Sequence, residues 1–460
     1  MNPSAPPSRG ASTPPPPRPA ATRPRWAAAC WAGAVLGALA ASTCRMPTPD
    51  EVVYTGAVAT NPTPTTPPTV PPPPLPTNTA GAAGAGGAAG AAGSVPFTKP
   101  ALLAAIAECT FGRYRDFEAS AVALRDVTAE HASGPTEERA GRVRQAWLAA
   151  TALWQEAEPF RFGPAASAIE PGGRDLRAQI YSWPEISRCK VEEQIVNQAY
   201  ADPGFPVTTL VNGRGLFSLE YLSFFGGTNN ACSQFSVINA PDNPQNWASL
   251  SPDELVLRKA AYGAASAADV LARASELVAE WGPEGAFRAQ FVGAGAGSTV
   301  YPGEQNALNA VSNAMFYVDQ EVKDFKVGRP VGYYECSAAT CPELVEARFS
   351  RNSVNNIRSN LRGFARLFNG CGAGDTGLGF DDWLGAVGAD DLAGRMRAAL
   401  AGAEATAAAI ELPIDEALAA DPAKVAALHA SIKTLTDLLK TEFITVLNLE
   451  LPRSAEGDND

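Results

Sequence analysis

The segment from Gly215 to Tyr221 contains the residue of this chain whose chemistry is easiest to define. It runs Gly-Leu-Phe-Ser-Leu-Glu-Tyr, so Glu220 follows Phe217 by three positions. Positions three apart lie on one face of a helix, and their side chains can act on the same ligand. The Glu220 carboxylate could bind a hard cation such as iron or calcium, or act as a general base if its pKa were raised. Phe217 can bind neither a metal ion nor a proton.

Histidine is scarce, which limits the catalytic chemistry that the chain can support. The sequence has two histidines, His131 in an expected loop and His429 on an expected amphipathic C-terminal helix. A zinc peptidase usually includes histidine among its three protein ligands, and a Ser-His-Asp triad requires a histidine beside the nucleophile. Both classes are therefore disfavoured.

The charge balance excludes nucleic acid as a partner. The chain has 36 Lys and Arg against 48 Asp and Glu, a formal net charge of -12. Nucleic-acid binding needs a concentrated basic surface. An acidic exterior instead favours solubility and attracts cations.

Residues 1–44 have the features of an export signal. Several arginines precede an apolar run from Trp26 to Ala41 that is rich in small residues, as signal peptides are. The run ends at Ala-Ser-Thr-Cys, similar to a bacterial lipobox, in which the cysteine receives the lipid. We therefore expect an anchor to the membrane at Cys44, with Arg45 favouring outer-membrane sorting. Simple secretion and an uncleaved anchor are the alternatives.

The remaining cysteines predict disulfides. Eight cysteines are present, and six lie beyond residue 44. An even set in an exported protein indicates disulfide bonding. Cys336 and Cys341 are close enough to close a small loop, whereas the pairing of the other four is left open. A zinc site is disfavoured because no pair has C-x-x-C spacing.

The N-terminal signal is followed by a low-complexity linker and then by helical sequence. Residues 45–97 are rich in Pro and Thr and then in Gly and Ala, and such a segment cannot bury a core. Trp147, Thr151 and Trp154 form one apolar stripe at helical spacing. Capping boxes at Ser251–Glu254 and Thr340–Glu343 begin helical segments that run to Trp281 and Asn369. Further helices are expected over about 98–130, 188–200, 208–225, 304–326, 390–410 and 421–448.

The fold class expected from this pattern is all-α. No alternating β pattern is long enough to predict a sheet. Residues 98–453 exceed the usual size of a single core, so two helical bundles are expected, with halves at about 98–245 and 250–453. Residues 454–460 form an acidic tail.

Several blocks of sequence, in order, resemble the imelysin family. Residues 154–164 fit its W-x-x-x-E-x-F-x-F-G-P pattern, and the Trp-Pro of residues 181–184 follows. Residues 215–221 fit G-x-H-x-x-E except that Phe217 replaces the histidine. Residues 345–354 are similar to its E-x-x-x-S-x-x-S block, and residues 451–460 to its acidic ending. The resemblance implies an all-helical, exported bacterial protein tied to iron uptake, with two bundle-like halves and a site between them.

The resemblance also implies a set of site residues. Glu158 and Glu220 would contribute ligand-binding carboxylates from the first half, with Glu220 as the expected metal ligand. Glu346, Ser350 and Ser353 would complete the site from the second half. Iron or another divalent cation is the expected cofactor.

Each of these residues also has a purely structural interpretation. Glu220 could be a helix-surface residue or a buried partner of Arg161 or Arg348. Glu346 could be an exposed charge in the first turn of a helix, and the two serines could cap or turn the chain.

The sequence therefore predicts an exported, lipid-anchored, non-catalytic envelope protein that binds a metal ion or an iron-containing ligand between its halves. Its expected location is the outer membrane, facing the periplasm or the surface, with envelope iron-uptake proteins as partners. One alternative is an imelysin-type metallopeptidase that replaces the missing histidine with another ligand. The other is a scaffold, or a module that binds carbohydrate or protein.

Overall fold

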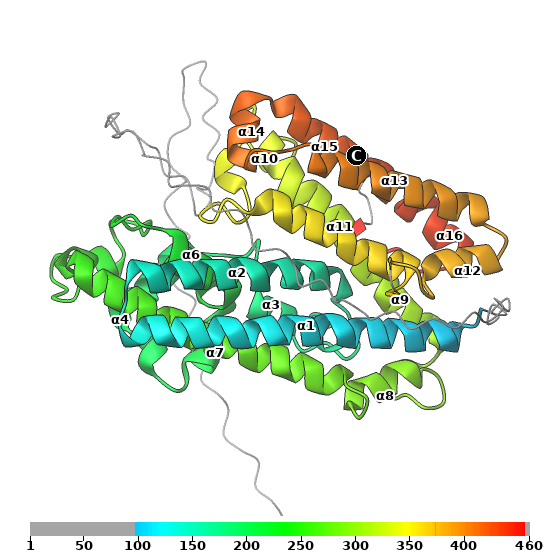
Figure 1. Cartoon of the computed structure of the whole chain (residues 1–460), viewed down its shortest axis with the longest axis horizontal. Coiled ribbons are helices and arrows are strands. Elements are labelled where there is room, and N and C mark those ends of the chain that lie inside the picture. Colours follow the sequence, from blue (N-terminus) through cyan, green and yellow to red (C-terminus); the bar gives the residue numbers. More distant parts are fainter. Residues whose placement is uncertain (1–96, 373, 456–460) are drawn as a thin grey trace, which may run out of the picture. The chain divides into compact units, whose positions relative to one another are not determined.

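Helices build the part of the chain that this computed structural model describes, residues 97–372 and 374–455, and no strand occurs within those residues (Figure 1). The all-α prediction is therefore confirmed. The α-helices are α1 (Lys99–Ser133), α2 (Glu137–Ala157), α3 (Leu176–Ile180), α4 (Arg188–Asn197), α5 (Phe205–Thr208), α6 (Gly215–Phe224), α7 (Pro252–Trp281), α8 (Ala286–Val292), α9 (Glu304–Met315), α10 (Arg329–Val331), α11 (Ser353–Asn369), α12 (Phe380–Ala386), α13 (Asp390–Ala408), α14 (Ile414–Ala420), α15 (Pro422–Leu438) and α16 (Ile444–Val446).

The expected export signal, the lipid-carrying Cys44 and the linker up to residue 96 lie outside the described residues, as do residues 456–460 of the expected tail. Those expectations therefore stay predictions. Among the described residues, no helix combines the length and the apolar character that crossing a bilayer requires.

Local sequence signals fix the ends of the long helices. Thr98 caps α1 and its hydroxyl accepts a hydrogen bond from the backbone N–H of Ala101. The predicted capping box at the start of α7 is present, with Ser251 and Glu254 bonded reciprocally. The apolar stripe predicted on α2, which ends in Trp154, is fully buried. These features depend only on neighbouring residues, which is why sequence reveals them.

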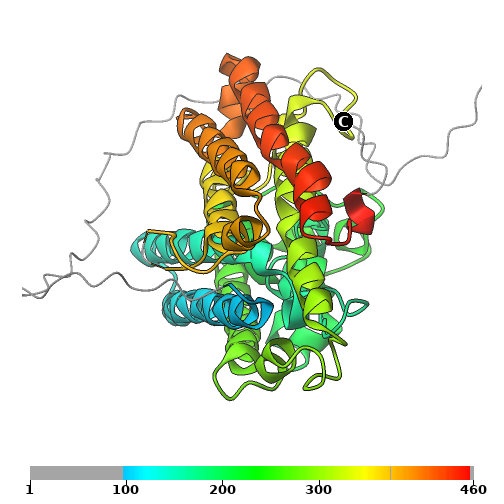
Figure 2. The ribbon, with the colours of Figure 1, turned by 90° about the vertical axis from the view of Figure 1, so that its right-hand side faces the viewer.

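The helices pack in two connected groups. Helices α1, α2, α6 and α7 contact one another, and α11 joins this group to α13 and α15 by packing on both α2 and α13. Figures 1 and 2 both show the yellow-to-red helices on one side of the cyan and green ones. Helix α7, which the division near residue 250 places in the second half, packs along α1 and α6.

The helix predicted over 304–326 is present, but its second part is wound differently. Residues Val318–Gly328 (η7) form a π-helix between α9 and α10, and Leu439–Phe443 (η9) form a shorter one after α15. π-Helical turns are rare in proteins overall, but those that occur often lie at functional sites. The wider turn of η7 carries Glu321 and Lys326, both almost completely buried, toward the site described below.

The segment before α11 differs from its prediction. The Thr340–Glu343 capping box was expected to begin a helical segment, but a short 3-10 turn, η8 (Pro342–Leu344), occupies the region and α11 begins at Ser353. Ala347 and Arg351 have positive φ angles of 50° and 61°, which interrupt a right-handed helix. Helix α6 likewise begins at Gly215 rather than at residue 208.

Three disulfides staple the described residues. Cys336 pairs with Cys341, as predicted from their spacing. The two pairings that the sequence left open are Cys189–Cys232 and Cys109–Cys371. The last pair is 262 residues apart and ties α1 to the chain that follows α11. It therefore links the two helical groups covalently.

Candidate functional site

Glu220 is held by the segment that precedes α11. Its Oε1 atom accepts hydrogen bonds from the backbone N–H groups of Phe349 (3.0 Å) and Ser350 (2.8 Å) and from the Ser350 hydroxyl (2.9 Å). The residue is 1% exposed, so the interpretation as a helix-surface charge is wrong. The left-handed turns of this segment aim both amides at the carboxylate. A glutamate of α6 is thereby bound to a block about 130 residues away.

The charge of Glu220 is not balanced by a cation. Within the described residues it forms no ion pair, and Arg161, a partner considered from sequence, pairs with Glu321 instead. Burial, helped by the nearby charge of Glu346, raises the pKa of the Glu220 carboxyl to about 7, although the hydrogen bonds from Ser350 and Phe349 lower it. Near neutral pH this carboxyl is therefore partly protonated and partly ionised.

The glycine of the motif positions α6. Gly215 has a φ of +78°, and a Cβ there would lie 2.5 Å from the carbonyl oxygen of Ile180 at the end of α3. Only glycine fits this approach. The next carbonyl, that of Leu216, accepts a hydrogen bond from Trp147 Nε1 at 2.9 Å. Phe217 is 4% exposed and belongs to the hydrophobic core. The motif's glycine is thus structural, and the residue in the histidine position packs.

Glu346 lies in a different electrostatic environment from Glu220. Its Oε1 atom faces Lys326 Nζ at 2.9 Å and accepts hydrogen bonds from the Tyr181 hydroxyl at 2.9 Å and Gln155 Nε2 at 3.3 Å. The side chain is 0% exposed, so the interpretation as an exposed first-turn charge is wrong. Its second oxygen, Oε2, is buried and has no hydrogen-bond partner within the described structure. This oxygen is available to a further ligand.

Lys326 is the main residue of the site that the sequence analysis missed. Besides Glu346, it donates to Gln155 Oε1 (2.6 Å) and Asn360 Oδ1 (2.8 Å), so three acceptors surround one ammonium. Burial lowers the pKa of Lys326, and Glu346 and Glu158 oppose that effect. In the sequence it is one lysine on a predicted amphipathic helix. The π-helical winding that carries it inward has no sequence signal.

Glu158 begins the 3-10 turn η1 (Glu158–Phe160) directly after α2 and is 1% exposed. Its two oxygens accept from different partners, Trp154 Nε1 at 2.5 Å and Arg177 Nε at 2.8 Å. The charge of Glu158 is therefore compensated by Arg177, and both oxygens are engaged. Its proximity to Lys326 places it at the edge of the same polar cluster.

The two predicted serines have distinct contacts. Ser350 donates its hydroxyl to Glu220, with the Ala347 carbonyl 3.1 Å away as a second acceptor. Ser353 is the first residue of α11, and its hydroxyl bonds the backbone carbonyl of Glu346. Ser353 does not cap α11, whose N-cap is Asn352 with no side-chain cap bond; its hydroxyl instead fixes the turn that precedes the helix. Ser350 both shapes the turn and contacts the carboxylate.

The five predicted site residues belong to one polar cluster: the three glutamates are buried, Ser350 is hydrogen-bonded to Glu220, and Ser353 is hydrogen-bonded to the backbone of Glu346. Besides Lys326, the sequence analysis missed Arg177 and Tyr181; Tyr181 directly precedes the Ser-Trp-Pro of the second block, which was the available signal. The cluster offers carboxylate, hydroxyl and amide oxygens, which hard cations prefer. Two cations lie within it, Lys326 paired with Glu346 and Arg177 paired with Glu158.

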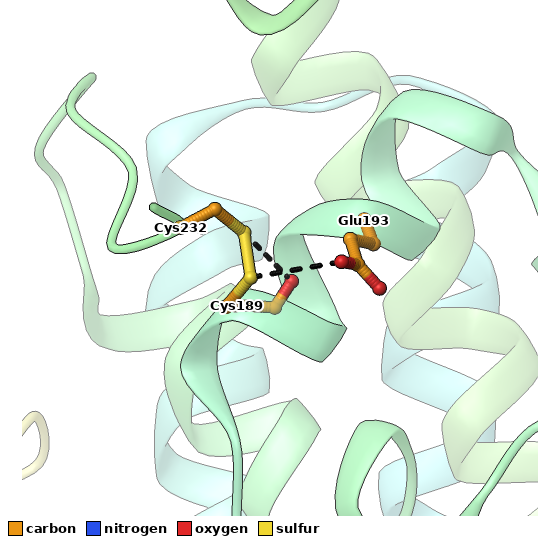
Figure 3. Close-up of side chains that lie close together, drawn as sticks. All are labelled: Cys189, Glu193 and Cys232. Atoms are coloured by element: carbon orange, nitrogen blue, oxygen red, sulfur yellow. Dashed lines mark hydrogen bonds between the residues drawn. A yellow bond between two sulfur atoms is a disulfide. The ribbon is translucent and has the colours of Figure 1, made fainter. Parts of the chain in front are cut away.

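A second cluster of potential ligands has a simpler explanation. Cys189, Glu193 and Cys232 bring three ligand atoms within 4.8 Å of one another, and this is the one such group of three or more among the described residues (Figure 3). The two sulfurs are joined as a disulfide, and Glu193 lies 3.8 Å from one of them. Metal binding requires thiolates. In the oxidised protein this group is therefore a disulfide that links α4 to the loop around Cys232.

Comparison with known proteins identifies the family of the chain and the structures that share its fold. The sequence model of the imelysin family matches residues 111–441, from the middle of α1 to the π-helix after α15. The chain belongs to the imelysin family. Among curated relatives, Iron-regulated protein A of Synechococcus elongatus is 25% identical over 342 residues, which cover 73% of this chain and 82% of that protein. The predicted family is confirmed.

Solved structures share the fold of this imelysin-family chain. A crystal structure described as an iron-regulated protein A precursor from Parabacteroides distasonis aligns with a TM-score of 0.58 at 17% identity, and covers 77% of this chain and 96% of that one. An imelysin-like protein from Psychrobacter arcticum aligns with a TM-score of 0.55, with the same identity and coverage. The three disulfides are consistent with an exported protein.

Proposed function

We propose that this protein is a non-catalytic cell-envelope member of the imelysin family, anchored through Cys44, that binds a metal cation or an iron-containing ligand at Glu220. The observation that carries the proposal is the buried Glu220 carboxylate, which lacks a cationic partner and is held between the two helical groups. A buried carboxylate without a counter-charge is costly. A bound cation would remove that cost.

The residues around Glu220 fit a hard divalent cation. Glu346 lies close enough to raise the pKa of Glu220, and its Oε2 atom is buried and unpaired within the described structure. Two carboxylates of this kind are the oxygen donors that iron(II) or calcium accepts. A bound cation would supply the positive charge that Glu220 lacks within the described residues. Glu220 and Glu346 would hold it, and the Ser350 and Phe349 donors would keep Glu220 oriented.

Protons compete with a cation at this site. Because burial raises the pKa of Glu220 to about 7, the carboxyl is largely protonated at pH 5 and largely ionised at pH 8. Cation affinity should therefore rise with pH across this range and level off above it.

Calorimetric titration of the purified protein tests the proposal. Ferrous iron under anaerobic conditions, ferric iron, zinc and calcium are each titrated into the wild type, Glu220→Gln and Glu346→Gln. We expect micromolar binding of at least one cation and at least tenfold weaker binding in both variants. Glu442→Gln is the matched control, because Glu442 is an exposed carboxylate paired with Arg395. It should bind as the wild type does.

The alternatives predict different results. Binding of no cation by the wild type would reject the metal-binding function and favour a scaffold or a receptor for carbohydrate or protein. A metallopeptidase would bind zinc and cleave an unfolded protein in a chelator-sensitive reaction. Phe217 packs in the core where the family motif has histidine, which favours binding over cleavage.

A further inference from the structure

A cleft of about 400 Å³ opens at one end of the group formed by α1, α2, α6 and α7. Its wall combines the end of α1, the turn into α2, the end of α6 with the loop that follows it, and the first turns of α7. A smaller cavity of about 50 Å³ adjoins the cleft, because His131, Ala140, Leu222 and Lys259 line both. The volume of the cleft lies in the range of about 300–1,000 Å³ that is typical of small-molecule sites.

Much of the wall of this cleft is apolar. Leu222, Phe225, Leu255 and Val256 contribute large apolar side chains to it. Val256 is 50% exposed, although it is an apolar residue of a helix that packs along two others. Covering apolar surface stabilises a complex by about 25 cal/mol for each Å² removed from water. The cleft therefore suits a ligand with an apolar body.

Lys259 is the one lysine or arginine among the described residues that line the cleft. Its Nζ atom donates to the backbone carbonyl of Phe225 at 2.8 Å, where α6 ends, and lies 5.3 Å and 5.1 Å from the ring centroids of Tyr221 and Phe225. Within the described residues it forms no ion pair with a carboxylate. Burial lowers the pKa of Lys259 to about 8. A carbonyl and two aromatic rings thus orient the ammonium, and its charge is left without a counter-charge.

The other charged groups near Lys259 are already paired. Glu192 of α4 raises the pKa of Lys259 and Arg188 lowers it, and these two residues form an ion pair with each other at 2.7 Å. Glu137 is the one carboxylate among the described residues that line the cleft, and it pairs with Arg144. The charges of both pairs cancel, so the cleft keeps the single positive charge of Lys259. Such a cleft attracts an anion.

An apolar wall that carries one unmatched ammonium defines the class of ligand. An ammonium has three N–H donors, and the Phe225 carbonyl uses one of them. A carboxylate can accept from the others in charge-assisted hydrogen bonds and supply the missing counter-charge. We propose that this cleft binds a carboxylate with an aliphatic chain, as in a medium-chain fatty acid, with the carboxylate on Lys259 and the chain against Phe225 and Val256.

This site is separate from the cation site at Glu220. Neither Glu220 nor Glu346 lines the cleft. Glu220 lies on α6 as well, but its carboxylate is bonded to the segment before α11. Binding of the carboxylate ligand should therefore persist in Glu220→Gln and in the presence of a chelator, so that failure of either proposal leaves the other intact.

Four related probes test the class of ligand on the full-length protein by calorimetry. Octanoate carries both the charge and the chain, octan-1-ol lacks the charge, octan-1-amine reverses it, and acetate lacks the chain. We expect measurable binding of octanoate and at least tenfold weaker binding of each of the other three. Octan-1-ol and octan-1-amine leave the ammonium of Lys259 without a counter-charge, and acetate leaves the apolar wall uncovered.

Proton uptake gives a readout that is specific to Lys259. Because a bound carboxylate favours the charged form of the ammonium, it should raise the pKa of Lys259 from about 8, and binding at pH 8 should take up roughly half a proton. Octanoate is ionised at this pH, and His131 is neutral because burial lowers its pKa, so neither contributes. Titrations in two buffers of different ionisation enthalpy measure the uptake. At pH 6, where Lys259 is already protonated, this uptake should vanish.

Two pairs of variants test the residues. Lys259→Met should fold normally, because burial already disfavours the ammonium, and it should bind octanoate at least tenfold more weakly and without proton uptake at pH 8. Lys424→Met is its control, because Lys424 is exposed on α15. Val256→Asn should weaken octanoate binding three- to tenfold. Leu257→Asn is the matched control, since Leu257 is 55% exposed on the same turn of α7 but does not line the cleft.

The proposal is overturned if the wild type fails to bind octanoate at millimolar concentration. It is also overturned if octan-1-ol or octan-1-amine binds as tightly as octanoate, since the charge of Lys259 would then select nothing. Equal octanoate affinity of Lys259→Met and Lys424→Met would place the carboxylate elsewhere, and equal affinity of Val256→Asn and Leu257→Asn would place the chain outside the cleft. Thermal unfolding of each variant without ligand confirms that it is folded.

Discussion

Glu220 and Glu346 are two buried carboxylates of one cluster, but their negative charges are compensated differently. Glu346 faces the ammonium of Lys326 at 2.9 Å. Glu220 receives neutral donors alone, two backbone amides and one hydroxyl. The first carboxylate is balanced by a charge within the fold, whereas the second is oriented but not neutralised.

The difference shows how a buried site can be prepared for a ligand. An ion pair with good geometry offsets both of its charges, although the remaining oxygen of its carboxylate can still accept a further ligand. Amide and hydroxyl donors fix the direction of a carboxylate but leave its charge to be matched by a proton or a cation. The charge of Glu346 is therefore offset within the fold while its second oxygen is left without a partner in the described structure, and the charge of Glu220 is left to a proton or a cation.

The largest expected effect comes from removing the cation of the balanced pair. Lys326→Met leaves Glu346 buried and without its counter-charge, and it also removes a donor from Gln155 and Asn360. We expect a loss of about 3–5 kcal/mol in the free energy of unfolding, as for other broken buried pairs. Urea denaturation followed by circular dichroism measures it.

The double variant Lys326→Met/Glu346→Gln is the control for that loss. It has no uncompensated charge, so it should recover part of the stability. A loss below about 1 kcal/mol in Lys326→Met would mean that the ion pair contributes little, and that the comparison between the two carboxylates is mistaken.

A smaller, pH-dependent effect is expected at Glu220. The folded state raises the pKa of this carboxyl from 4.5 to about 7 and so binds more protons than the unfolded chain between those values. The free energy of unfolding of the wild type should therefore fall as pH rises from about 4.5 to 7. Glu220→Gln has no carboxyl to bind this proton, so its free energy of unfolding should not fall for this reason. The free energy of unfolding of the variant, relative to that of the wild type, should therefore rise by up to roughly 3 kcal/mol across this window. Above it the difference should stay constant.

Urea denaturation at several pH values, with a chelator present, measures this difference. Glu442→Gln is again the control, because the hydrogen bond from Arg395 lowers the pKa of Glu442 and its titration lies below the window. Its stability difference from the wild type should be constant from pH 5 to 8. A constant difference for Glu220→Gln as well would show that this carboxyl keeps an ordinary pKa.

The smallest effect is expected from one hydroxyl. Ser350→Ala removes one of the three hydrogen bonds to Glu220 and leaves both amides, at a cost of about 1 kcal/mol. Because that bond favours the ionised form, the pH midpoint assigned to Glu220 should move upward. Ser353→Ala is the matched control, since its hydroxyl bonds a backbone carbonyl. A midpoint that falls in Ser350→Ala would contradict the account of Glu220.

Much of the secondary structure was predictable because its causes are local. The capping box of Ser251 and Glu254, the apolar stripe ending in Trp154 and the Cys336–Cys341 disulfide each involve residues close in sequence. The family blocks likewise named five candidate residues without knowledge of their contacts, and the three glutamates among them are buried. Local patterns predict secondary-structure elements and candidate residues, but they do not predict the contacts between distant residues.

Two features of the site had no reliable local signal. The residues 345–352 follow a plausible capping box, yet Ala347 and Arg351 turn left-handed so that the amides of the segment reach Glu220. The π-helix of residues 318–328 has an ordinary amphipathic sequence, yet its winding buries Lys326. In both cases contacts made after folding outweigh the helical preference of the segment.

The sequence by itself determined that this chain is helical, that it belongs to the imelysin family and that it lacks the motif histidine at Phe217. The tertiary structure alone decided which buried carboxylate has a cation. The donors to Glu220 lie 129 and 130 residues away along the chain. Glu346 lies 20 residues from Lys326, but 165 and 191 residues from Tyr181 and Gln155. Burial and charge pairing at such separations depend on how helices pack, and no periodicity or spacing in the sequence encodes them.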